Sequence, residues 1–400
     1  MIPRRRIPIA GRDLRDVFTA PFVPRTQDAA DIAAFEEAFR QRVGCAYAVA
    51  TASGREALLL IVDALRLGPG DEMIVPAYTL GELLPLIAAR GIRCVAADID
   101  PATLNVTAAR VGARITPKTR AILVDHLFGA PCEIGALMQL AARHGLPLIE
   151  DCAHAVGAYA DGKPVGSFGD AALFSLEVSK GVATFGGGML TTSNRQIAEH
   201  ARQAVADRLR HPGPAVRKAA LKYVEEMAVR SPLYALAARL MFGGRGNGFE
   251  RAYRRAHDQL RQPSVGYSGM QARIGLRRLG ALDERNRRFN AMWLELADDL
   301  PPGFAAPLRD RHGSPAFYNF AARYDGDIVR LRRAAQTQGL DLAIRGEVMD
   351  DCAVLLGQAD CPEAAAAYAK IVQVPLHDGL GADGPRRVAK KLAAAACQCR

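Results

Sequence analysis

The most informative feature of the sequence is a regular alternation of short apolar runs with helix-like stretches between residues 45 and 195. The apolar runs predict strands over Met73–Pro76, Arg93–Ala97, Ala121–Asp125, Leu146–Glu150, Ala171–Ser175 and Gly188–Thr192. The segments between them, such as Gly54–Leu67 and Ile134–His144, have apolar residues at helical spacing and are closed by glycines. An alternation of this length is typical of a largely parallel sheet covered by helices.

The sequence pattern changes near residue 200, where the strand-like runs stop and the chain becomes helical and arginine-rich. A long helical segment follows from about residue 265, and strand-like Phe317–Tyr324 and Ile371–Val374 come after it. We therefore predict three parts, which are a basic N-terminal arm over 1–25, a large domain over 26–262 with an insert at 200–262, and a long helix with a smaller α+β domain over 263–400.

The composition narrows the class of protein. Half of the 400 residues are hydrophobic, which allows a large buried core. No apolar run approaches the roughly 20 residues of a membrane span, and the basic start lacks the apolar stretch of a secretory signal. The eight cysteines form no CxxC pair and no zinc-like group. We expect a cytoplasmic protein with reduced cysteines and no metal site.

The first candidate site is a helix start, where Ser53 is followed three residues later by Glu56 and then by an apolar periodic run. This pattern is typical of a capping box, and it predicts a helix that begins at Gly54. The free N–H groups at such a helix start can bind a phosphate. A helix cap with no further role fits the same pattern.

Two strand ends carry the other candidates. One strand ends in Glu150-Asp151, with His154 shortly after, and open α/β sheets bind ligands at this edge. The strand Ala171–Ser175 leads into a short turn with Lys180, which Gly186–Gly188 follow. Partial desolvation of an amine at such a strand exit makes it a usable nucleophile for carbonyl groups. Taken alone, Asp151 fits a helix cap as well as a functional carboxylate, whereas His154 and Lys180 fit a structural histidine and a solvated loop lysine better than reactive groups.

Together, these pieces suit one cofactor, pyridoxal phosphate. A lysine forms a Schiff base with it, and an aspartate keeps its pyridine nitrogen protonated, so that the ring can accept electrons from a substrate carbanion. The capped helix start would bind its phosphate group.

In the order and spacing of these pieces, the chain resembles the sugar aminotransferases of the DegT/DnrJ/EryC1/StrS family. The matching stretches are Phe35-Glu36, Tyr47–Ala50, Ser53-Gly54, Gly68–Thr79, Asp98–Pro101, His126–Gly129, Glu150–His154, Phe174–Lys180 and a weaker Val374–Leu380. The match is dense over residues 25–195, patchy from 263 to 295 and thin beyond. The resemblance implies the aspartate aminotransferase-like fold of type I pyridoxal-phosphate enzymes.

Carried over position by position, the resemblance implies a role for each candidate residue. Lys180 would hold the cofactor covalently and move protons. Asp151 would pair with the pyridine nitrogen, Tyr78 would stack on the ring, and His154 would lie near the ring oxygen. The phosphate would be held by Ser53, Gly54, Arg55 and Ser175.

Several positions depart from the family pattern. Arg55 stands where threonine is usual, and Gly186–Gly188 lacks the usual glutamate. In the segment Gly266–Met270, Ser268 replaces an asparagine that reaches the phosphate of the partner subunit. The segment Arg345–Met349 replaces a His-Tyr pair near the substrate. We therefore expect cofactor binding to be retained, whereas the identity of the substrate does not transfer.

The formal net charge of +10 is concentrated in two places. Residues 200–262 contain 13 Lys and Arg against 5 Asp and Glu, and residues 1–25 contain six arginines against two aspartates. Three interpretations of the insert remain open. It can be a helical cover over the active-site mouth or dimer seam, an attractor of an anionic substrate such as a nucleotide sugar, or a membrane-surface helix over Leu233–Phe242 that brings the protein to the inner membrane surface. Nucleic acid is not indicated, because stacking aromatics and a reading motif are missing.

The sequence thus predicts a homodimeric, pyridoxal-phosphate-dependent aminotransferase of polysaccharide or secondary-metabolite biosynthesis. It would move an amino group from an amino acid, with glutamate as the expected donor, to a nucleotide-linked keto sugar. Two alternatives stay open, namely a pyridoxal-phosphate enzyme for a non-sugar ketone and a non-catalytic regulatory or membrane-associated relative.

Overall fold

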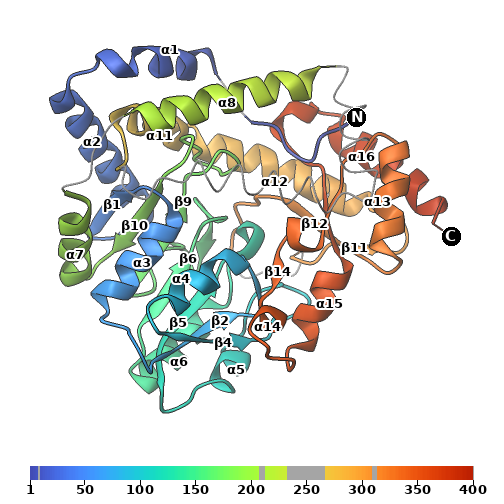
Figure 1. Ribbon diagram of the computed structural model, residues 1–400. Coiled ribbons are helices and arrows are strands. Elements are labelled where there is room, and N and C mark those ends of the chain that lie inside the picture. Colours follow the sequence, from blue (N-terminus) through green and yellow to red (C-terminus); the bar gives the residue numbers. More distant parts are fainter. Residues whose placement is uncertain (8–9, 207–211, 232–265, 309–312, 400) are drawn as a thin grey trace.

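The computed structural model describes residues 1–7, 10–206, 212–231, 266–308 and 313–399. The predicted membrane-surface helix Leu233–Phe242 lies outside these residues. Figure 1 shows a large body built around a twisted sheet, with a smaller body formed by the C-terminal residues beside it.

The large body is built on a seven-stranded sheet with the strand order β1-β10-β9-β6-β5-β2-β4. Its strands are β1 (Tyr47–Thr51), β2 (Glu72–Pro76), β4 (Arg93–Ala97), β5 (Thr119–Asp125), β6 (Leu148–Asp151), β9 (Ala171–Ser175) and β10 (Gly188–Thr192). Within this sheet only β10 runs antiparallel to its neighbours. The prediction of a mostly parallel sheet is therefore confirmed, although the edge strand β1 was not predicted.

Side chains that alternate along the strands divide the core into two layers. On β2, Met73 and Val75 belong to one apolar cluster and Ile74 to the other, because successive side chains point to opposite faces. The first cluster includes residues of α3 (Gly54–Ala64), α4 (Leu84–Ala88) and α7 (Arg195–Ala206), and the second includes residues of α2 (Arg25–Val43), α5 (Ala108–Gly112) and α6 (Ile134–His144). Helices thus cover both faces, as a parallel sheet requires.

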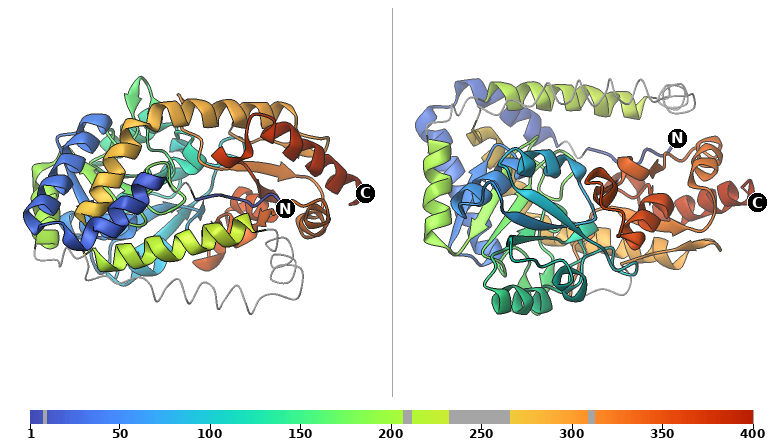
Figure 2. Two further views of the ribbon diagram at one scale, coloured as in Figure 1. Left: turned by 90° about the horizontal axis from the view of Figure 1, so that it is seen from above. Right: turned by 60° about the horizontal axis from the view of Figure 1, so that its bottom comes forward.

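The small C-terminal body is an α+β unit, best seen in the two views of Figure 2. Its sheet has the order β11-β12-β15-β13. The strands are β11 (Phe304–Ala305), β12 (Phe320–Tyr324), β13 (Ala343–Ile344) and β15 (Ile371–Val374), and the helices are α13 (Ile328–Thr337), α14 (Cys352–Leu355), α15 (Pro362–Lys370) and α16 (Gly384–Cys397). The predicted strand over 317–324 therefore begins three residues later, at Phe320.

Two helices lead from the large body to the small one. The helix α11 (Gly269–Gly280) packs against α2, and a Cβ on Gly275 would stand 2.6 Å from the ring of Phe35. The next helix, α12 (Leu282–Asp298), carries Trp293, whose ring centroid lies 4.0 Å from that of Phe317. Because α11 packs against the large body, the domain boundary at residue 263 stays a prediction.

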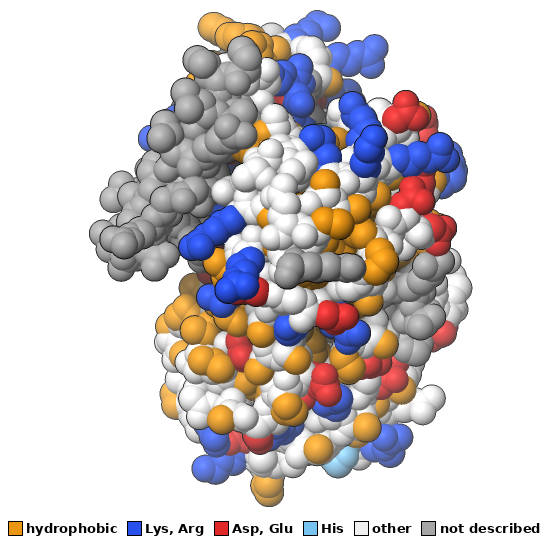
Figure 3. All heavy atoms as spheres, turned by 90° about the vertical axis from the view of Figure 1, so that its right-hand side faces the viewer, with side chains coloured by type: hydrophobic (Ala, Val, Ile, Leu, Met, Phe, Trp, Pro, Cys, Tyr) orange, Lys and Arg blue, Asp and Glu red, His pale blue; other side chains and the backbone are white. Residues whose placement is uncertain are grey.

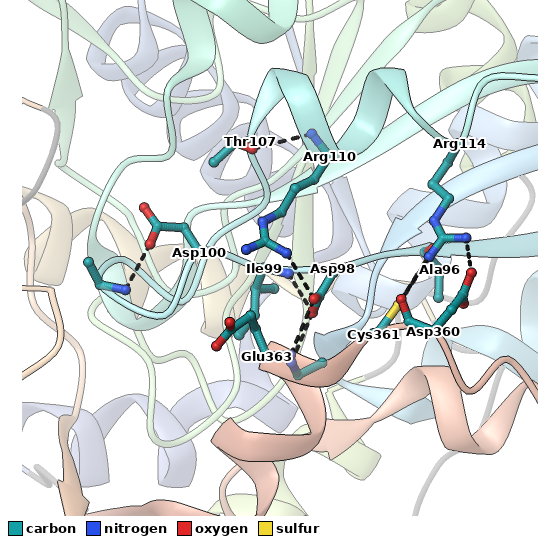
Figure 4. Close-up of polar contacts among 12 residues, drawn as sticks. Ala96, Asp98, Ile99, Asp100, Thr107, Arg110, Arg114, Asp360, Cys361 and Glu363 are labelled. Atoms are coloured by element: carbon teal, nitrogen blue, oxygen red, sulfur yellow. Dashed lines mark hydrogen bonds and ion pairs between the residues drawn. The ribbon is translucent and has the colours of Figure 1, made fainter.

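Polar contacts hold α15 of the small body against the end of β4 (Figure 4). The Asp98 carboxylate accepts hydrogen bonds from the backbone N–H groups of Glu363-Ala364, at 3.2 and 2.9 Å, which are among the free donors of the helix start. Arg110 donates to the same carboxylate at 2.8 Å, and Arg114 pairs with Asp360 nearby. The motif that begins at Asp98 therefore joins the two bodies.

The described residues of the basic insert are the end of α7 and the long helix α8 (Gly213–Arg230), which runs along the top of Figure 1 from α1 (Gly11–Thr19) toward the small body. Its small residues Ala215 and Ala219 pack with Val17 of α1 and with Val178 and Phe185 from the turn after β9. The helix therefore covers the turn that carries the predicted catalytic lysine.

Many of the basic side chains are paired with carboxylates inside the molecule. Asp13 of α1 pairs with Arg277 and Arg278 of α11, and Arg6 of the N-terminal arm pairs with Glu226 of α8. On the face shown in Figure 3, Lys and Arg are interspersed with Asp and Glu. In the part of the chain that the structure describes, no helix has both the length and the apolar character needed to cross a membrane.

Candidate active site

A cavity of about 370 Å³ opens at the carboxyl ends of β5, β6 and β9. This volume is typical of a small-molecule site, and open α/β sheets bind ligands at this edge. The cavity brings together seven of the eight predicted site residues, namely Ser53, Gly54, Arg55, Asp151, His154, Ser175 and Lys180. Tyr78 does not line it.

The start of α3 forms one wall of the cavity. The Ser53 hydroxyl oxygen accepts a hydrogen bond from the Glu56 N–H at 3.1 Å, so Ser53 caps a helix that begins at Gly54, as predicted. Glu56 accepts from the Ala52 N–H at 2.6 Å, so the reciprocal bond lies one residue before the expected one. A Cβ on Gly54 would stand 3.4 Å from the Cβ of Ser175 on β9. Glycine thus lets the helix start approach β9 closely.

Three cations of the cavity wall have carboxylate partners. Arg55, which departs from the family pattern, forms an ion pair with Glu82. Lys218 of α8 donates to both oxygens of Glu177, at 2.6 and 2.8 Å. Burial raises the pKa of Glu177, but the charge of Lys218, its hydrogen bonds and the Val178 N–H together hold this pKa below its usual value. Lys222, on the next turn of α8, pairs with a glutamate of the same helix.

Lys180 differs from these cations. Its backbone N–H donates to the Glu177 carbonyl at 2.9 Å, which closes the turn after β9. Its Nζ lies 4.5 Å from the centroid of the Tyr318 ring, and among the described residues no carboxylate forms an ion pair with it. Tyr318 is fixed in turn by a 2.6 Å hydrogen bond between its hydroxyl group and that of Ser179. Of the three lysines in the cavity wall, Lys180 therefore has the amine that can react with a carbonyl group.

Two aspartates on neighbouring strands form the floor of the cavity, since Asp125 and Asp151 are register partners on β5 and β6. Desolvation raises the pKa of both carboxyl groups. The charge of Asp151 raises that of Asp125 further, while the Ala153 N–H, at 2.8 Å, and Lys180 oppose the rise at Asp151. The Oδ1 atom of Asp125 is buried, and none of the described residues forms a hydrogen bond with it. A protonated ring nitrogen brought to this floor would compensate the buried negative charge.

His154 is held between two aromatic rings. Its ring centroid lies 4.4 Å from that of Tyr318 and 5.9 Å from that of Phe128, both in stacked orientation. Desolvation and, second, the charge of Lys180 hold the pKa of His154 well below its usual value, so the ring is neutral. Because its Nδ1 accepts the Phe128 N–H at 3.3 Å, its proton lies on Nε2.

Tyr78 is the one predicted site residue outside the cavity. It lies on β3 (Tyr78–Thr79), and its ring is 1% exposed within the hydrophobic core. Burial raises the pKa of its hydroxyl group. Thr79 lines the cavity instead, because its side chain points to the side opposite that of Tyr78, and Leu80, the first residue after β3, lines it as well. The expectation that Tyr78 stacks on the cofactor ring does not agree with this placement, and Leu80 is the apolar side chain that this segment offers.

Several residues that sequence reasoning did not name reach the cavity or Lys180, although a cover over the active-site mouth is one of the three interpretations of the insert. They are Arg5 of the N-terminal arm, Lys218 and Lys222 of the insert, and Tyr318, which contacts Lys180. The charge surplus of the arm and the insert was the only signal for the first three. Met349, from the divergent segment, also lines the cavity.

Ser268, which replaces an asparagine of the family pattern, caps α11. Its hydroxyl group donates to Oε1 of Gln271 at 3.0 Å, and the residue is 1% exposed. Ser268 thus uses its hydroxyl group within its own chain.

The residues of the cavity fit pyridoxal phosphate. The start of α3 and Ser175 form a narrow cradle for the phosphate group, which the glycine at position 54 keeps open. Asp151 would pair with the ring nitrogen. The neighbouring Asp125 adds a second buried carboxyl group to the cavity floor. Lys180 would bind the carbonyl carbon through its amine.

The sequence matches the DegT/DnrJ/EryC1/StrS aminotransferase family over residues 25–393. It is 43% identical over 155 residues to UDP-N-acetyl-3-dehydro-alpha-D-glucosamine 3-aminotransferase of Acidithiobacillus ferrooxidans, a match over 38% of this chain and 42% of the relative. It is 42% identical over 167 residues to GDP-perosamine synthase of Caulobacter vibrioides, over 42% of this chain and 45% of the relative. The chain thus spans less than half the length of the curated relatives that it matches.

The whole fold is similar to the crystal structure of the aminotransferase TlmJ from Streptoalloteichus hindustanus. The TM-score is 0.78 at 24% sequence identity, over 100% of this chain and 99% of that chain. This likeness confirms the predicted aspartate aminotransferase-like fold. Because the family match extends over nearly the entire sequence, the chain belongs to the DegT/DnrJ/EryC1/StrS family of pyridoxal-phosphate-dependent aminotransferases.

Proposed function

We propose that this protein transfers an amino group from an amino acid, with glutamate as the donor, to a keto sugar linked to a nucleotide. The observation that carries the proposal is the state of Lys180, whose amine lies in the cavity beside an aromatic ring while Lys218 is paired with a carboxylate. The two curated relatives are named for a UDP-linked and a GDP-linked sugar, which supports a nucleotide sugar as acceptor.

Each residue of the cavity has a defined task in this proposal. The bound cofactor would supply an electron sink for the negative charge that develops at the substrate α-carbon. Lys180 Nζ would take the proton from the α-carbon of the donor and pass it to the carbon of the cofactor within the same half-reaction, and it would move a proton in the opposite direction when the acceptor is bound. Asp151 keeps a proton on the ring nitrogen. His154, neutral and stacked on Tyr318, offers the N–H of Nε2 to the ring oxygen as a hydrogen-bond donor.

The visible spectrum of the loaded protein tests the proposal. We expect yellow protein that loses its visible absorption when glutamate is added and regains it when a keto nucleotide sugar follows, because the two half-reactions run in turn. Initial rates should show ping-pong kinetics. A colourless protein that ignores added cofactor would support a non-catalytic relative, and bleaching that only a non-sugar ketone reverses would support the other alternative.

We further propose a homodimer in the cytoplasm. Large apolar side chains are exposed on two neighbouring segments, namely Phe18 (74%) and Phe22 (85%) around the end of α1, and Val224 (64%) and Met227 (52%) on α8. Apolar groups this exposed are typical of a surface that another protein covers. Light scattering should give twice the mass of one chain, and charged substitutions at Phe22 and Val224 should produce monomers. A wild-type monomer at micromolar concentration would contradict the proposal.

A further inference from the structure

The N-terminal arm contains three consecutive arginines, Arg4-Arg5-Arg6, and two of them form ion pairs with different parts of the molecule. Arg4 donates to both oxygens of Asp341, at 2.8 and 3.0 Å, and lies 3.5 Å from Glu347, both in the small body. Arg6 donates to Glu226 of α8 at 2.5 Å. The arm thus bridges the small body and the helix that covers the cavity.

The backbone of the arm is fixed on both sides of Arg5. The N–H of Ile2 donates to the Gly339 carbonyl at 2.7 Å, and the N–H of Ile7 donates to Glu226 at 3.1 Å. Ile7 is 6% exposed and belongs to the apolar cluster beneath α8. The position of Arg5 is therefore set by contacts that do not involve its own side chain.

Arg5 lines the cavity, and its side chain is exposed at the mouth. The cations Arg55, Lys218 and Lys222 of the cavity wall have carboxylate partners, whereas Arg5 forms no ion pair with any residue that the structure describes. A guanidinium group without a carboxylate partner, held at the entrance of a site, is suited to bind an anion through its planar set of donors.

We propose that Arg5 binds the diphosphate group of the acceptor substrate at the mouth of the cavity. This inference rests on the proposed function, since it names how the nucleotide-linked part of that acceptor is held. A phosphoryl anion matches the bidentate geometry of arginine. The cofactor phosphate is the other phosphoryl group in the site, but its cradle lies on α3 and β9, whereas Arg5 comes from the arm at the outer edge.

The affinity for nucleoside diphosphates tests this assignment. It is measured on the cofactor-loaded protein without any amino donor. Isothermal titration with UDP and with GDP should show that Arg5→Gln weakens the binding of at least one of them by about tenfold to a hundredfold, the effect of one charge-assisted contact. Arg5→Lys should restore part of the affinity, because the charge remains but the fork of donors is lost. Uridine and guanosine, which lack phosphates, should bind wild type and variants alike.

The matched control is Arg15→Gln on the exposed side of α1, which removes the same charge from the same arm and should leave nucleotide binding unchanged. The affinity of the apo-protein for pyridoxal phosphate, followed by absorbance, should not change in Arg5→Gln. A loss of pyridoxal-phosphate affinity with intact nucleotide binding would assign Arg5 to the cofactor phosphate and overturn the proposal. Equal losses in Arg5→Gln and Arg15→Gln, or wild type that binds neither nucleotide, would overturn it as well. Failure of amino transfer with intact Arg5-dependent UDP or GDP binding would contradict only the proposed function.

Discussion

Replacing Lys180 by alanine should abolish amino transfer, with a loss of rate of at least about 10⁴-fold. Positioned proton transfer contributes up to about this factor in enzymes, and the variant loses the covalent link to the cofactor in addition. The other two lysines of the cavity cannot replace Lys180, because Lys218 is bound to Glu177 at 2.6 Å and Lys222 is paired on its own helix.

The covalent link gives a second readout besides activity. After reduction with borohydride, mass spectrometry of the wild-type protein should find the cofactor on the peptide that contains Lys180, and the Lys180→Ala protein should carry none. Lys163→Ala is the matched control, because Lys163 is an exposed lysine on the short strand β8 (Lys163–Pro164) and should keep both activity and label. Retained turnover in Lys180→Ala, or a label on Lys218, would contradict the assignment.

The sequence allowed a prediction of most strand boundaries, since these depend on local pattern. The strand β5 ends at Asp125 as predicted, whereas β6 runs over Leu148–Asp151 and not over the predicted Leu146–Glu150. The boundaries of β4, β9, β10 and β15 agree with the apolar runs, and the capping residue Ser53 lies where the spacing to Glu56 places it. These features follow from interactions between residues that are close in the chain, namely alternation, helix period and capping.

The residues at the cavity mouth could not be predicted, because contacts between distant segments position them. Arg6 meets Glu226 across 220 positions, and this contact sets where Arg5 lies. Tyr318 meets Ser179 across 139 positions. Contacts between residues so far apart in the chain leave no periodic pattern in the sequence from which they could be predicted. Tyr78 shows a different limit, since the family motif places the correct segment at the site, but the tyrosine itself is buried in the core while Thr79 and Leu80 line the cavity.

The pair Glu150-Asp151 shows why neighbouring residues of one motif can have different roles. Asp151 lines the cavity, whereas Glu150 is fully buried behind it. The Glu150 Oε1 atom accepts the N–H groups of Phe168 and Gly169, each at 2.8 Å, and Oε2 accepts that of Gly166 at 2.7 Å. Its carboxylate therefore fixes the turn that leads into β9, which carries Ser175 at its other end.

The ring of His126 completes the bonding of this carboxylate. The N–H of Cys132 donates to Nδ1 of His126 at 3.2 Å, so the ring proton lies on Nε2, which donates to Oε2 of Glu150 at 3.0 Å. The two oxygens of Glu150 thus accept hydrogen bonds from four donors and act only as acceptors.

Glu150→Gln should therefore destabilise the protein by about 3–5 kcal/mol, the usual cost of breaking a buried, charged hydrogen-bond network. The amide NH₂ group must face either the two N–H groups at Oε1 or the N–H groups at Oε2, and buried donors that face one another lose their hydrogen bonds. Thermal and urea unfolding measure the loss. The same change at the exposed Glu199, which pairs with Arg195 on the surface of α7, should cost less than about 1 kcal/mol. Equal stability of the two variants would show that the Glu150 network is not needed to hold the floor of the site.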